Sequence, residues 1–118
     1  MRKLMLTAVI AAAAGYPGAA RSADYAPLDC AEAQSAAEIT ICRSYSLGQA
    51  EARMATLYAI DMSLVAMGQR GDIGDAQRQW LKTREACGRD VACLSKAYGD
   101  RIRQLNSVIG DIASRGPY

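Results

Sequence analysis

The stretch CLSKAYGDRIRQLNSVIGDI, residues 93–112, decides the fold class of this chain. Its apolar side chains recur in steps of 4, 4, 3, 4 and 3 residues, which is the spacing of one face of an α-helix. We therefore expect an amphipathic helix that begins near Asp90 and ends at Gly116 and Pro117. The residues of this stripe are Leu94, Tyr98, Ile102, Leu105, Ile109 and Ile112.

Upstream of this stretch the sequence predicts three further helices. Ser35 and Glu38 have the spacing of a capping box, which begins a short helix that runs to about Cys42. A second such box at Ser46 opens a longer helix to about Gly68, with an apolar stripe that includes Leu64. The predicted core positions of that helix are Leu47, Ala50, Met54, Leu57, Tyr58, Leu64 and Val65.

The segment from Gly68 to Gly74 contains three glycines in seven residues, and we expect it to be a loop. Asp72 or Asp75 would then cap the next helix, which continues to about Cys87. No segment has the pattern of a strand. The sequence thus predicts a small all-α bundle of three main helices plus a short leading one.

Composition supports this fold class and excludes several functions. The 118 residues are 51% hydrophobic but include no Phe, so the core is built mainly from Ala, Leu, Ile, Val and Met. The chain has no His, which excludes Ser-His or Cys-His catalysis and His-ligated zinc. We expect no metal, no cofactor and no catalytic residue.

The first 22 residues have the three-part pattern of a secretory signal peptide. Arg2 and Lys3 precede an apolar run of 11 residues, 4–14, which is too short to span a bilayer. Small residues at Ala20 and Ser22 place the cleavage before Ala23, leaving one domain, 23–118. Cys30 follows Asp29 rather than a small residue, so we expect no lipidation. The mature protein would be soluble, periplasmic or secreted, and without a stable membrane anchor.

Removal of the signal peptide also changes the charge balance. The whole chain carries a net charge of +2, but three of its basic residues precede Ala23, which leaves 11 basic against 12 acidic residues. A nearly neutral domain lacks the basic surface that binds nucleic acid.

Four cysteines in an exported domain indicate two disulfides. On one continuous helix, the Cα atoms of Cys87 and Cys93 would lie about 9 Å apart, beyond the roughly 7 Å that a disulfide spans. Gly88, however, allows the chain to turn between them, which favours a Cys87–Cys93 bridge. Cys30–Cys42 then follows by elimination, and a crossed pairing remains open.

The order of these motifs resembles the N-terminal domain of the LprI-like lysozyme inhibitors, a family of small exported bacterial proteins. The resemblance extends from about residue 28 to 105, and its most specific part is Gln-x-x-Trp-Leu-x-x-Arg-x-x-Cys at residues 77–87. In place of the Leu-Asp pair usual in the family's second helix, this sequence has Ala50 and Glu51. The motif residues are Gln77, Trp80, Leu81, Arg84, Tyr98 and Arg101.

Helical spacing allows two interpretations of the motif. Trp80 and Tyr98 would fill the bundle centre, while Arg84 and Arg101 cover that core with their stems. Their guanidinium groups would pair with Glu51 or Asp61. In the alternative, one of the arginines is presented to a partner.

The resemblance implies that the protein binds a lysozyme and performs no chemistry of its own. A lysozyme cleft holds catalytic carboxylates, and the predicted loop offers Arg70 and Asp72 as candidate partner-binding residues. The loop would equally serve as an ordinary connection. The second candidate is another cell-envelope binding or stress module on the same scaffold. An enzyme is disfavoured because the acidic residues are scattered singly.

Overall fold

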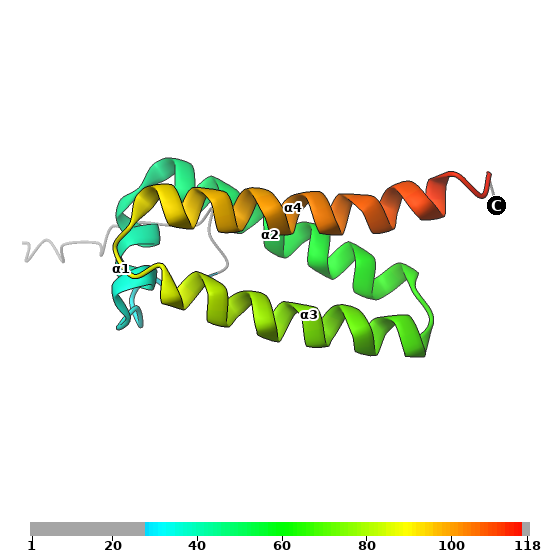
Figure 1. Cartoon of the computed structure of the whole chain (residues 1–118), viewed down its shortest axis with the longest axis horizontal. Coiled ribbons are helices and arrows are strands. Elements are labelled where there is room, and N and C mark those ends of the chain that lie inside the picture. The colour runs from blue at the N-terminus through cyan, green and yellow to red at the C-terminus, as the bar shows by residue number, and fades with distance from the viewer. Residues whose placement is uncertain (1–27, 117–118) are drawn as a thin grey trace, which may run out of the picture.

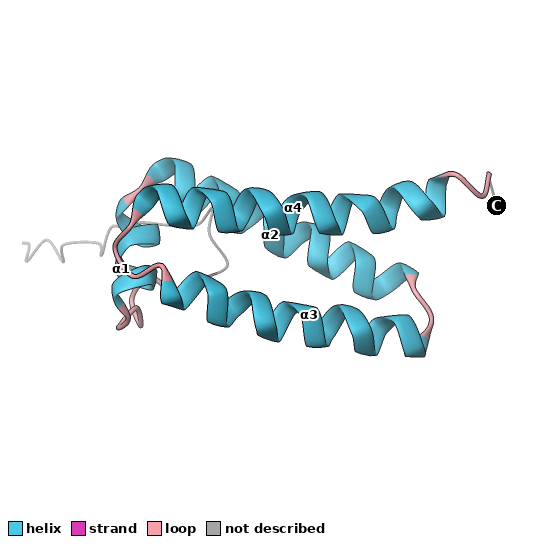
Figure 2. Cartoon of the chain, in the orientation of Figure 1, coloured by secondary structure: helices cyan, strands magenta, loops and turns pink. Residues whose placement is uncertain are grey.

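The computed structural model describes residues 28–116, which form four helices joined by short turns (Figure 1). Helix α4 contacts each of the other three helices, and its contact with α2 is the most extensive. Figure 2 shows helices and loops throughout this part of the chain, with no strand. The predicted all-α fold is confirmed, while the predicted signal peptide, 1–22, lies outside the described residues. The helices are α1 (Ala36–Arg43), α2 (Tyr45–Leu64), α3 (Met67–Ala86) and α4 (Val91–Ala113).

Local capping sets where three of the helices begin. The capping box of Ser35 and Glu38 begins α1 as predicted, and the Asp90 carboxylate accepts a hydrogen bond from the Cys93 amide at the start of α4. The prediction for α2 was wrong by two residues. Its cap is Ser44, whose hydroxyl accepts from the Leu47 amide at 3.3 Å, rather than Ser46.

The predicted loop from Gly68 to Gly74 is wrong, because this segment is the first part of α3. Only Val65 and Ala66 connect α2 to α3, and neither Asp72 nor Asp75 caps a helix. The glycines reduce helix propensity, but the buried side chain of Ile73 anchors the segment in the core. Arg70 and Asp72 therefore project from a helix.

The core lies between the three long helices and is closed at one end by α1. The α4 stripe is confirmed for Leu94, Tyr98 and Leu105, which are buried, whereas Ile102 and Ile112 are half-buried. The residues expected to face the core from α2 are buried or half-buried, with one exception. Leu64 is exposed because α2 ends there, whereas Val65, which follows it, is buried. The buried side chains of α1 and α2 that meet the α4 stripe include Ala37, Ile41, Leu47 and Met54.

Both disulfides join neighbouring segments at the α1 end of the bundle. Cys30 pairs with Cys42 and Cys87 with Cys93, with Cα separations of 5.7 and 5.5 Å, so the local pairing is confirmed and the crossed pairing is excluded. Gly88 has a φ of 55° and turns the chain between α3 and α4, as its position predicted.

Candidate functional site

Three motif side chains, Trp80 and Arg84 of α3 and Tyr98 of α4, form a buried polar cluster with Glu51 of α2. The Tyr98 hydroxyl donates a hydrogen bond to Glu51 Oε2 at 2.7 Å. Arg84 Nη1 lies 3.6 Å from Glu51 Oε1, and the Trp80 ring nitrogen donates to the carbonyl oxygen of Ala97 at 2.8 Å. The buried cluster thus connects α2, α3 and α4 through polar contacts.

The aromatic rings fix the geometry of this cluster. The Trp80 and Tyr98 rings meet edge to face, with their centroids 5.1 Å apart, and the Arg84 guanidinium lies 5.7 Å from the centre of the Trp80 ring. Burial, together with the negative charge of Glu51, raises the pKa of the Tyr98 hydroxyl well above its ordinary value. Tyr98 therefore stays protonated and remains a hydrogen-bond donor to Glu51.

Arg101, which is itself buried, forms a second set of polar contacts further along α4. Its guanidinium donates to Gln77 Oε1 at 2.9 Å, to Gln104 Oε1 at 3.1 Å and to the Ile73 carbonyl oxygen at 3.3 Å. The Gln77 amide in turn lies 3.3 Å from the sulfur of Met54 on α2. The motif residue Gln77 thus links Arg101 to the neighbouring helices.

The expected pairing of the arginines with acidic residues is formed at one of the two positions. Arg84 pairs with Glu51, but among the described ion pairs there is none between Arg101 and Asp61. Asp61 is fully buried, and neither of its carboxylate oxygens has a hydrogen-bond partner within residues 28–116. Burial raises the pKa of Asp61, against the opposing effect of the Arg101 charge.

These contacts support the structural interpretation of the motif. Arg84 is 5% exposed and Arg101 3%, so their charged groups are held inside the protein rather than presented to a partner. Leu81 is half-buried and packs against the same core. The motif residues therefore fix how the three long helices pack.

A different part of the surface carries exposed apolar side chains. At the turn between α2 and α3, Ile60 is 39% exposed, Leu64 56% and Met67 84%. We call these three residues, together with Arg70, the α2–α3 tip. The other large exposed apolar residues of the described chain, Tyr45 and Val91, are the first residues of α2 and α4, at the opposite end (Figure 1).

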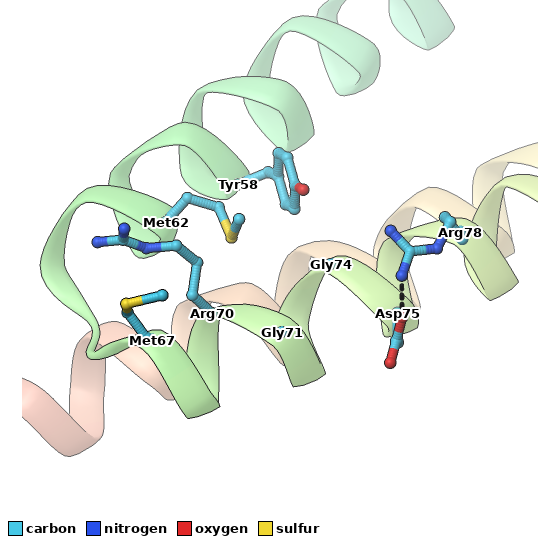
Figure 3. Close-up of a pocket in the computed structure, with 8 residues that line it drawn as sticks. All are labelled: Tyr58, Met62, Met67, Arg70, Gly71, Gly74, Asp75 and Arg78. Carbon is cyan, nitrogen blue, oxygen red and sulfur yellow. Dashed lines mark hydrogen bonds and ion pairs between the residues drawn. The ribbon is translucent and has the colours of Figure 1, made fainter.

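A shallow pocket of about 370 Å³ adjoins the α2–α3 tip (Figure 3). Tyr58 and Met62 of α2 point toward α3, and the Arg70 side chain extends from α3 toward α2. Arg70 Nη2 donates to the Val65 carbonyl oxygen at 3.2 Å, which caps the end of α2. The remaining lining residues are Met67, Gly71, Gly74, Asp75 and Arg78.

The positive charges around this pocket outnumber the negative ones. Arg78 forms an ion pair with Asp75 one turn before it on α3. Arg70 is exposed and has no carboxylate partner among the described ion pairs. The pocket thus carries one uncompensated positive charge beside apolar surface.

The structure does not bring Arg70 and Asp72 into one pocket. Asp72 is exposed and lines a separate hollow of about 410 Å³ between α3 and α4, together with Ile73, Arg101 and Leu105. Two residues that follow closely in sequence therefore face different neighbouring helices, because α3 is helical here.

Comparison with known proteins identifies the family. The family model described as lysozyme inhibitor LprI matches residues 29–109. The chain belongs to the LprI family. No curated protein and no solved structure matches it.

The LprI match covers both disulfides and the whole buried motif, so the features that stabilise this fold lie within the family region. The matched region also includes the α2–α3 tip. The sequence analysis did not predict that apolar side chains are exposed there. The available signal was Ile60, which is large and apolar but lies off the predicted core stripe of its helix.

No group of three or more His, Cys, Asp or Glu side chains within residues 28–116 is placed to hold a metal ion. None of the helices in the described range is long and apolar enough to cross a membrane.

Proposed function

We propose that this LprI-family protein binds a peptidoglycan-cleaving lysozyme and blocks it, without chemistry of its own. The observation that carries the proposal is the family match over residues 29–109. The fold is consistent with this function. Its buried motif arginines and its Glu51 carboxylate bind groups of the neighbouring helices, which makes them part of the scaffold.

The proposed site of action is the cell envelope or its surroundings. Two disulfides suit an oxidising compartment outside the cytoplasm. A lysozyme cleaves between two carboxyl groups in an open cleft, so a protein that occupies the cleft prevents substrate from entering. We infer that the protein is exported and protects the glycan strands of peptidoglycan in this way.

Titration of lysozyme with the oxidised protein tests this function. The protein is produced by export from the full chain, so that both disulfides form, and is added to animal-type and goose-type lysozymes that digest cell walls. We expect a stoichiometric loss of lysis with at least one type. If neither enzyme is inhibited at large excess, while helical structure and both disulfides are intact, the proposed function is wrong.

The second candidate is a cell-envelope binding module that inhibits no lysozyme. The exposed α2–α3 tip is compatible with this function as well, because apolar surface of this kind serves recognition of many proteins. Recovery of a defined envelope protein with the oxidised protein, together with undiminished lysis, would support this second function over the first.

A further inference from the structure

The α2–α3 tip presents its apolar side chains on a short, anchored turn. Only two residues, Val65 and Ala66, join the helices, and the Val65 side chain is buried in the core. Ile60 and Leu64 are one helical turn apart on α2, and Met67 begins α3. A turn that is already ordered loses little conformational entropy when it binds.

Arg70 adds a positive charge to this apolar surface. Its guanidinium is held near the turn by the Val65 carbonyl oxygen, which leaves further N–H donors for a partner. Because Asp75 is paired with Arg78, the nearby carboxylate of the pocket does not compensate Arg70. The tip therefore combines an exposed apolar turn with one cation that has no carboxylate partner in the described part of the chain.

We propose that the α2–α3 tip enters the substrate cleft of the lysozyme and that Arg70 faces the catalytic carboxylates. This inference rests on the proposed function and names the surface that contacts the lysozyme. Two carboxyl groups flank the scissile bond in such a cleft, and ligand clefts are concave and mostly apolar. Arg70 complements the carboxylates, while Leu64 and Met67 cover the apolar walls.

The opposite end of the bundle offers matched control residues. Arg89 is an exposed arginine in the turn between α3 and α4, with no ion pair among the described residues. Val91 is exposed and apolar at the start of α4. Both lie next to the Cys87–Cys93 bridge, far along α3 and α4 from the tip (Figure 1).

The first experiment compares inhibition by tip and control variants of the oxidised protein. Arg70→Glu, and Leu64→Ser combined with Met67→Ser, are expected to raise the half-inhibitory concentration by about tenfold or more, the scale of a lost interface anchor. Arg89→Glu and Val91→Ser are expected to change it by less than about twofold. Circular dichroism and thermal unfolding confirm that each variant is folded.

The second experiment asks what Arg70 faces. Calorimetry measures binding to active lysozyme and to a lysozyme whose catalytic carboxylates are replaced by amides. Arg70→Glu is expected to weaken binding to the active enzyme about tenfold more than binding to the amide enzyme, because the repulsion requires the carboxylates. Arg70→Gln, which removes the charge without reversing it, is expected to give a smaller loss in the same direction.

The outcomes separate this inference from the proposed function. If the parent protein inhibits and the tip variants inhibit equally well, the tip is not the contact surface, although the inhibitor function stands. An equal loss of binding to both forms of the enzyme places Arg70 away from the carboxylates and overturns the inference. If the parent protein inhibits no lysozyme, the proposed function is wrong, and the inference that the tip binds a lysozyme cleft is wrong with it.

Discussion

Alanine in place of Gly68 and Gly71 tests whether the segment after the α2–α3 turn is helical in solution. Both glycines lie in the first turns of α3, and neither has a positive φ. An added Cβ at either position meets no neighbouring atom within 4 Å. The substitutions therefore change the conformational freedom of the backbone without disturbing the packing.

The expected effect is an increase in stability. Alanine at a helical position suited to it stabilises by about 0.4–1 kcal/mol relative to glycine, mainly because the unfolded chain has fewer conformations to lose. Gly71 lies within the helix, and we expect it to give the larger part of a combined gain of about 1–2 kcal/mol. For a domain of this size, each kcal/mol raises Tm by roughly 4–8 °C.

Thermal unfolding of the oxidised protein, followed by far-UV circular dichroism, measures this gain. Gly88→Ala is the control, because this glycine-to-alanine change is expected to lower Tm. Gly88 also has open space around it, but its φ of 55° places alanine in the left-handed region, at a cost of about 1–2 kcal/mol. If Gly68→Ala and Gly71→Ala lower Tm as Gly88→Ala does, the segment is not a helix and the reasoning is refuted.

Three further predictions concern one disulfide and two buried side chains. Serine at both Cys87 and Cys93 opens a loop with a sequence separation of 6, and should lower the unfolding free energy in urea by about 2.4 kcal/mol on the chain-entropy model; an unchanged midpoint would contradict this. Tyr98→Phe leaves Glu51 Oε2 without its donor and should cost about 1–3 kcal/mol in the same assay, whereas a neutral result would mean that water replaces the hydroxyl. Because burial raises the pKa of Asp61, the folded state holds this proton to a higher pH than the unfolded chain does. The stability that the protonated carboxyl contributes is therefore full below the ordinary pKa of 3.8 and is lost as pH rises through the folded pKa. Asp61→Asn should therefore stabilise the protein more at neutral pH than in acid, and a gain independent of pH would refute the assignment.

Local signals in the sequence were enough for most of the fold. The capping box at Ser35 and the Asp90 cap each act over three residues, so both can be identified without tertiary information. The α4 stripe was equally clear, since one helix must bury its apolar face. Gly88, placed between two nearby cysteines, correctly predicted a turn and a local disulfide.

Glycine content misled the prediction where tertiary packing outweighs local propensity. The segment from Gly68 to Gly74 is typical of a loop in its composition, but the burial of Ile73 against the other helices favours the helical conformation. The same error hid the true end of α2 and the exposure of Leu64. A glycine signals a turn reliably only where the backbone requires a positive φ, as at Gly88.

The candidate site was only partly accessible from the sequence. The motif identified Trp80, Arg84, Tyr98 and Arg101 and left two roles open for the arginines. The choice between a buried and a presented arginine depends on contacts between distant segments. Tyr98 and Glu51, for example, are 47 residues apart and meet only when α2 and α4 pack.

The sequence by itself determined the all-α class, the number of helices between residues 28 and 116, and the family, because helix periodicity, caps and motif spacing are properties of short segments. The tertiary structure alone decided that the motif arginines are buried and that Ile60, Leu64 and Met67 are exposed together with Arg70 in the α2–α3 tip. Periodicity shows which face of a helix is apolar. Which residues lose contact with water depends on where each helix ends and which neighbour covers it, and only the packed bundle sets both.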